Sequence, residues 1–193
     1  MAAPTHAHVS HDTHSTTSGG AWSTRRIATT ALLCALAFVL TFVEIPIFPP
    51  APWLMYDPSG IVALVAALVY GPATGTVVAV LPWVLKTLFS FNVWGHLMAI
   101  LAGVALCVPA ALVARRVGGT RGLVAGMVVG GMVSLAACVA GNIVVTPLYT
   151  AVSTADVIAM IVPILLPFNL LKIVLNCIVT ALVQGPVSAL VSR

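Results

Sequence analysis

The sequence predicts an all-α integral membrane protein, a six-helix transmembrane bundle with both termini in the cytoplasm. Of its 193 residues, 61% are hydrophobic and only 6% are charged, whereas a soluble domain has about 25% charged residues. The apolar residues form long uncharged runs that match the thickness of a bilayer. The arginines lie near the ends of these runs, which indicates topology and not nucleic-acid binding. We therefore expect a multi-pass protein of the cell membrane.

The chain divides into a polar tail, residues 1–24, and a membrane domain, residues 25–193. The tail consists mostly of Ser, Thr, Gly, Ala and His, and this composition predicts disorder. A solvated tail is favoured over a weak metal site formed by its histidines, which are His6, His8, His11 and His14. The cysteines lie in separate apolar runs and are interpreted as packing residues; they are Cys34, Cys107, Cys138 and Cys177.

The first apolar run, residues 27–43, follows Arg25-Arg26 and contains no charged residue. A signal peptide is the competing interpretation, but no small-residue cleavage site followed by a polar domain is present. We predict a retained first helix. It carries Ala31 and Ala35 four residues apart, and this spacing of small residues lets another helix approach closely.

A proline-rich loop follows, with four prolines among residues 46–52, which excludes a helix and favours an extended chain. The loop is apolar and is followed by Trp53 and Tyr56, so we expect it to fold over something apolar or to lie at the membrane interface. Asp57-Pro58 is typical of a helix start, with Asp57 as the cap. A role for Asp57 in a ligand pocket is an equally weighted alternative.

The next uncharged run, residues 58–85, is long for one span and short for two. A single span would place Arg115 on the opposite side of the membrane from Arg25, whereas a hairpin at Gly71-Pro72 places all six arginines on the cytoplasmic side. The positive-inside rule favours the hairpin. The remaining spans are expected at 94–114, 122–145 and 163–191, which brings the total to six.

Close helix packing is also expected in the fifth span, where Gly126 and Gly130 are four residues apart. Both lysines lie within apolar runs, toward the end of the bundle opposite to the arginines. Lys86 is one turn from the end of its run and is expected to extend outward to water.

Most of the intramembrane polar residues gather toward the outer side, and such residues are costly in lipid and are therefore functional candidates. Asn169 and Lys172 share one helix face because they are three residues apart. An Asn side chain both donates to and accepts from a uracil-like ring edge, and aromatic side chains can stack on an aromatic ligand. The candidate pocket residues are Asn169, Lys172, Asn142, Asp57, Tyr149, Trp83 and His96.

Structural roles compete with each of these interpretations. Lys172 could instead snorkel or pair with Asp57 or Asp156, and Asn169 could bond a neighbouring helix. His96 is interpreted as a satisfied polar group in preference to a metal ligand, and Trp83 as an interface anchor in preference to a ligand platform.

No catalytic motif and no phosphate-binding loop for ATP appear in the sequence. The expected activity is therefore binding and not catalysis. A transporter without its own energy source needs an energised partner.

Several segments follow one another along the chain: Asp57-Pro58-Ser59, Gly71-Pro72-Ala73-Thr74-Gly75, Gly95 to Gly103, Pro147-Leu148-Tyr149 and Pro167-Phe168-Asn169-Leu170-Leu171-Lys172. Together they resemble one known family, the substrate-binding S components of energy-coupling factor (ECF) vitamin transporters. The likeness is greatest to the S components specific for riboflavin and covers about residues 25–192, and the last of these segments is its most specific part.

The resemblance implies six helices around an outward-opening pocket that is capped by the first loop. It implies riboflavin as transported ligand, with no cofactor. It also implies assembly with a transmembrane coupling protein and two cytoplasmic ATPases, with Ala31 and Ala35 facing the coupling protein. Asn169, Lys172 and Asn142 stand where the family has residues that approach the flavin.

Three positions depart from the riboflavin pattern. Pro82-Trp83 replaces a Lys-Asn pair, His96 stands at the place of an acidic residue, and Gly60 stands where a second acid is common. Another vitamin or another aromatic heterocycle therefore remains an alternative ligand. A stand-alone secondary carrier and a small membrane enzyme are the alternatives of a different class.

Overall fold

The computed structural model describes residues 22–47, 49, 51 and 54–191. Nearly all of them are helical. The elements are α1 (Thr24–Leu40), β1 (Ile45–Pro46), β2 (Met55–Tyr56), α2 (Ser59–Tyr70), α3 (Pro72–Lys86), α4 (Val93–Val117), α5 (Gly119–Tyr149), α6 (Thr154–Met160), the π-helix η1 (Ile161–Leu165) and α7 (Leu166–Val191). The predictions for the histidine-containing tail up to residue 21 and for Trp53 lie outside the described residues.

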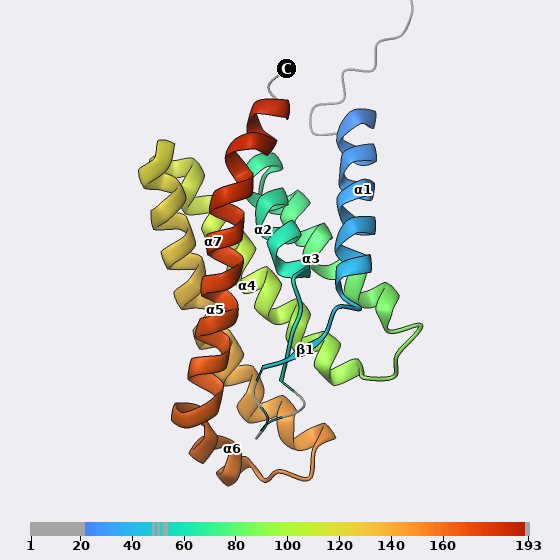
Figure 1. Ribbon diagram of the computed structural model, residues 1–193, viewed down its shortest axis with the longest axis vertical. Helices are drawn as coiled ribbons and strands as arrows, with labels where there is room; N and C mark the ends of the chain where they lie inside the picture. Colours follow the sequence, from blue (N-terminus) through green and yellow to red (C-terminus); the bar gives the residue numbers. More distant parts are fainter. Residues whose placement is uncertain (1–21, 48, 50, 52–53, 192–193) are drawn as a thin grey trace, which may run out of the picture.

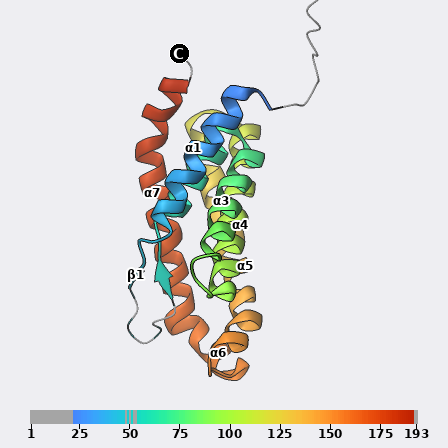
Figure 2. The same cartoon turned by 90° about the vertical axis from the view of Figure 1, so that its right-hand side faces the viewer.

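Within the described part of the chain the helices form six segments, because α6, η1 and α7 run on as one helix over Thr154–Ala189. This stretch, α4 and α5 are each long and apolar enough to cross a membrane. The predicted helical bundle is confirmed. The start of α1 and the end of α7 lie at one end of the bundle, and the β1–β2 hairpin and α6 lie toward the other (Figures 1 and 2).

The turn between α2 and α3 is as tight as predicted. Gly71 adopts a φ of 109°, which a residue with a side chain rarely adopts, and Pro72 occupies the first turn of α3. The guanidinium of Arg26 donates to the Tyr70 carbonyl at 3.2 Å and to Thr74 Oγ1 at 2.9 Å. The side chain of Arg115 also lies against Gly71. The hairpin therefore brings arginines from α1 and α4 to the same end of the bundle.

Helix α1 buries one face and exposes the other. Thr30, Cys34 and Ala37 are buried, and their spacing matches one face of an α-helix. Ala31 and Ala35 are exposed. The small-residue pair of the first helix is thus not used for packing within the chain.

Helices α4 and α5 pack closely against each other, as the glycine spacing predicts. A Cβ atom at Gly126 would lie 2.4 Å from the Ala110 carbonyl oxygen, and one at Gly130 would lie 2.5 Å from that of Leu106. These distances are far below van der Waals contact, so only glycine permits this approach.

Three details of the sequence prediction are corrected. The proline-rich loop contains a short antiparallel hairpin, with Ile45 opposite Tyr56. Helix α2 begins at Ser59 with Pro58 as the N-cap, one residue later than predicted. The last helical stretch begins at Thr154 and not near residue 163, because Ser153 and Asp156 form a capping box that starts α6.

We expect Gly130→Val to destabilise the bundle by about 1–3 kcal/mol, because the added atoms meet backbone and cannot be accommodated by a side-chain rotation. Thermal unfolding of the detergent-purified protein measures the effect. Gly185→Ala is the control, since a Cβ there meets nothing within 4 Å. Equal melting temperatures for the two variants would contradict the close α4–α5 packing.

Candidate ligand-binding site

A cavity of about 170 Å³ lies at the hairpin end of the bundle. Its walls come from the hairpin, α3, α4, α5 and α7. All seven side chains that the sequence analysis selected line it: Asp57, Trp83, His96, Asn142, Tyr149, Asn169 and Lys172. Residues far apart in the sequence are therefore brought to one site.

An ion pair between α7 and Asp57, two residues before the start of α2, lies in the wall of this cavity. Lys172 Nζ donates to Asp57 Oδ2 at 2.7 Å, and the two side chains are 16% and 5% exposed. The second carboxylate oxygen of Asp57 accepts hydrogen bonds from the backbone N–H and the hydroxyl of Ser59. Asp57 therefore both stabilises the start of α2 and forms part of the cavity. Asp156 belongs to the α6 capping box and does not pair with Lys172.

Asn142 and Asn169 in the cavity wall hydrogen-bond within their own helical stretches and not to neighbouring helices. Asn142 Nδ2 donates to the Cys138 carbonyl at 2.7 Å, and its Oδ1 accepts from Thr146. Asn169 Nδ2 donates to the Leu165 carbonyl at 2.8 Å. Among the described residues, no donor reaches Asn169 Oδ1. This oxygen remains an acceptor at the cavity wall.

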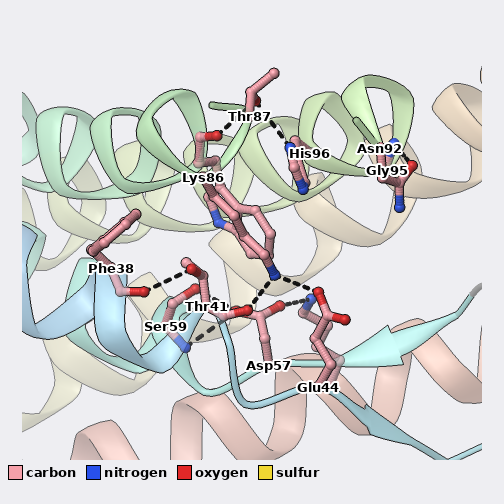
Figure 3. Close-up of polar contacts among 12 residues, drawn as sticks. Phe38, Thr41, Glu44, Asp57, Ser59, Lys86, Thr87, Asn92, Gly95 and His96 are labelled. Carbon is pink, nitrogen blue, oxygen red and sulfur yellow. Dashed lines mark hydrogen bonds and ion pairs between the residues drawn. The ribbon is translucent and has the colours of Figure 1, made fainter. Parts of the chain in front are cut away.

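Trp83 and His96 form an aromatic wall. Their ring centroids are 5.4 Å apart and their planes are inclined by 41°. Trp83 is 7% exposed, so it is not an anchor on the lipid surface. His96 Nδ1 lies 2.9 Å from Thr87 Oγ1 (Figure 3). In the described part of the chain, no three His, Cys, Asp or Glu side chains gather as a metal site would require.

Lys86 was expected to extend outward to water, but this prediction is wrong, because the residue is only 3% exposed. Its ammonium group donates to the Thr41 carbonyl and to the Glu44 carboxylate (Figure 3). It also lies 4.9 Å from the ring centroid of Trp83 and 5.3 Å from that of Phe42, within cation–π range. The end of α1 and the start of the hairpin supply the acceptors that hold it inside. Lys86 therefore fixes the hairpin to α3.

Sequence reasoning missed two buried polar residues, Tyr56 and Asn176. The Tyr56 hydroxyl donates to Asn176 Oδ1 at 3.3 Å. Burial raises the pKa of the Tyr56 phenol; nearby Asp57 also raises it, and Lys172 lowers it. The phenol is thus a protonated donor at neutral pH. Helical periodicity contained a signal for Asn176, because it lies seven residues after Asn169 and hence on the same face.

A polar cavity enclosed by one end of an apolar helical bundle is typical of a membrane-embedded solute-binding protein. The family model described as "ECF transporter, substrate-specific component" matches residues 25–184, and the chain belongs to this family. The family is a membrane transporter component and not a family of enzymes.

Two curated proteins and a solved structure are among the proteins to which this chain is similar. It is 34% identical over 101 residues to "Riboflavin transporter RibU" of Staphylococcus aureus (strain TCH60), which covers 52% of this chain and 53% of the relative. It is 28% identical over 104 residues to "Riboflavin transporter FmnP" of Bacillus subtilis (strain 168), with 51% and 54% covered. The matches thus span about half the length of these curated relatives.

The solved structure is described as "Structure and mechanism of the S component of a bacterial ECF transporter". It shares 29% sequence identity with this chain at a TM-score of 0.76, over 88% of this chain and 98% of the solved one. The S-component fold is therefore common to both along almost their whole length.

The hairpin anchor predicts an unequal effect of removing either charge. Glu44→Gln leaves the buried ammonium of Lys86 without its carboxylate, whereas Lys86→Met leaves a carboxylate that is 44% exposed and is solvated by water. We expect Glu44→Gln to cost about 1–3 kcal/mol of unfolding free energy and Lys86→Met to cost less. Thermal unfolding at constant pH compares the two. A larger loss in Lys86→Met would show that Glu44 is not the group that holds the ammonium.

Proposed function

We propose that this chain is the riboflavin-binding S component of an ECF importer in the cell membrane. The observation that carries the proposal is the convergence of amides, an ion pair and aromatic rings on one cavity within a bundle of the S-component family. The two curated relatives are named as riboflavin transporters, which supports riboflavin as ligand. An isoalloxazine offers ring-edge donors and acceptors to the amides and a planar face to the rings.

Orientation follows from the charges. Arg25, Arg26, Arg115 and Arg121 lie at or near helix ends on the side of the α2–α3 turn, and the positive-inside rule assigns this side to the cytoplasm. The cavity then opens outward. Both termini would lie in the cytoplasm, on the side where ATPases bind and hydrolyse ATP.

Ligand binding is tested by flavin fluorescence quenching on detergent-purified protein, with thiamine and biotin as controls. We expect saturable quenching with a dissociation constant well below micromolar. Asn169→Ala should weaken binding by about 1–3 kcal/mol, because a buried partner is left unpaired. Gln184→Ala is the matched control, since it removes an amide near the opposite end of α7. An absence of riboflavin quenching in a folded sample would overturn the ligand assignment.

Replacing Lys172 alone would leave Asp57 charged and buried, and would therefore destabilise the fold as well as affect binding. The experiment on Lys172 must separate these two effects. The double variant Lys172→Met with Asp57→Asn removes both charges together. We expect it to melt near the wild-type temperature and to bind riboflavin at least tenfold more weakly. Undiminished binding would remove this pair from the site.

Assembly with a transmembrane coupling protein and two ATPases is proposed through the exposed face of α1. Ala31→Leu with Ala35→Leu should abolish co-purification with the coupling module and leave riboflavin affinity unchanged, because both side chains point away from the bundle. Leu32→Phe is the control, since it adds bulk to an exposed position beside this face. Retained assembly of the double variant would place the contact elsewhere.

A further inference from the structure

A second, narrower chamber lies beside the cavity described above. Its volume is about 30 Å³, and it shares Asn169 and Lys172 with the larger cavity as lining residues. A cavity needs about 10–15 Å³ to hold one water molecule. The chamber therefore has room for a single water or for one functional group at the edge of a larger ligand.

Asn176 brings an unused hydrogen-bond donor to this chamber. The residue lines the chamber and is only 2% exposed. Its Oδ1 accepts from the Tyr56 hydroxyl at 3.3 Å, and its Nδ2 takes no part in that bond. Among the described residues, no acceptor bonds to Nδ2, so this donor is available at the chamber wall.

The absence of a side chain at Gly60 leaves the space that the Asn176 amide occupies. A Cβ atom at residue 60 would lie only 2.6 Å from Asn176 Nδ2, so no other residue leaves the amide where it is. Both residues line the chamber. The position of the Asn176 amide thus depends on a glycine at residue 60.

Thr180 provides a second, independent observation one turn further along α7. Its side chain is fully buried and, among the described residues, its Oγ1 has no hydrogen-bond partner. A helical threonine usually bonds the carbonyl four residues before it, and this one does not. Asn169, Lys172, Asn176 and Thr180 share one helix face, so the polar face continues inward past the cavity.

We propose that Asn176 is a further specificity-determining residue, whose Nδ2 donates to an acceptor atom in the inner chamber. The acceptor is an oxygen or ring nitrogen and belongs either to the bound ligand or to one water that contacts it. This inference rests on the proposed function and adds a donor that lies deeper than Asn169 and Lys172. Tyr56 is the positioning residue, because its hydroxyl fixes which end of the amide faces the chamber.

The test compares the wild type, Tyr56→Phe and the double variant Tyr56→Phe with Asn176→Leu. Because the phenol is already absent in Tyr56→Phe, replacing Asn176 as well leaves no hydroxyl group without its partner. Riboflavin affinity is measured by fluorescence quenching. We expect the double variant to bind at least tenfold more weakly than the wild type, and Tyr56→Phe to lose part of this affinity because it releases the amide. Equal affinities of the wild type and the double variant would overturn the inference, while wild-type binding keeps the proposed function. A wild type that binds no flavin overturns the proposed function, and the inference falls with it.

Gly60→Ala is a second variant that leaves Asn176 chemically intact but displaces its amide. We expect a loss of affinity similar to that of the double variant. Gly103→Ala is its matched control, because it adds the same methyl group to the lining of the same chamber, where the nearest atom is Ala79 Cβ at 3.3 Å. Equal losses in both glycine variants would mean that chamber volume matters and the amide does not, which overturns the inference.

The melting temperatures without ligand separate the two sources of the acceptor. If the acceptor belongs to the ligand, Nδ2 is unpaired in the free protein, and adding Asn176→Leu to Tyr56→Phe leaves the melting temperature unchanged or raises it. If a water occupies the chamber, Nδ2 is already paired, and the same addition lowers the melting temperature of the free protein.

Discussion

The cost of burying charge in an apolar bundle determines how this protein is arranged at its cavity end. An isolated ammonium group inside a membrane protein is expensive, and both lysines of the chain are largely buried. Each is paired with a carboxylate that lies next to the β1–β2 hairpin in the sequence, Lys86 with Glu44 and Lys172 with Asp57. The hairpin is therefore held at both of its ends by ion pairs to different helices, α3 and α7.

This pairing links the shape of the cavity to the position of the hairpin. Asp57, Lys172 and Glu44 all line the cavity, so the groups that hold the hairpin are also groups that a ligand meets. The ion pair that holds the hairpin to α7 is thus also part of the cavity wall, whereas α4 and α5 are held together by close packing at their glycines.

Local rules predicted most of the helices, and the seven side chains that were selected from the sequence line one cavity. Gly71-Pro72 marked the turn, and helical spacing put Asn169 beside Lys172. The environment of Lys86 could not be predicted in this way, since its acceptors are the Thr41 carbonyl and Glu44, more than 40 residues away. The start of the last helical stretch was missed because a π-helix containing Pro163 interrupts the α-helical hydrogen bonding, and the proline suggested a boundary instead.

The glycine at residue 60, where a second acid is common in the riboflavin pattern, has a different meaning in the fold than in the sequence. Seen in the sequence alone, a glycine in place of an acid removes a polar group from the site. In the folded chain the space beside Gly60 is filled by the amide of Asn176, which comes from a helix more than 100 residues later. A carboxylate side chain at residue 60 and this amide could not occupy the same volume. A polar group is therefore supplied to the same region by another helix, and it is a neutral amide and not a carboxylate.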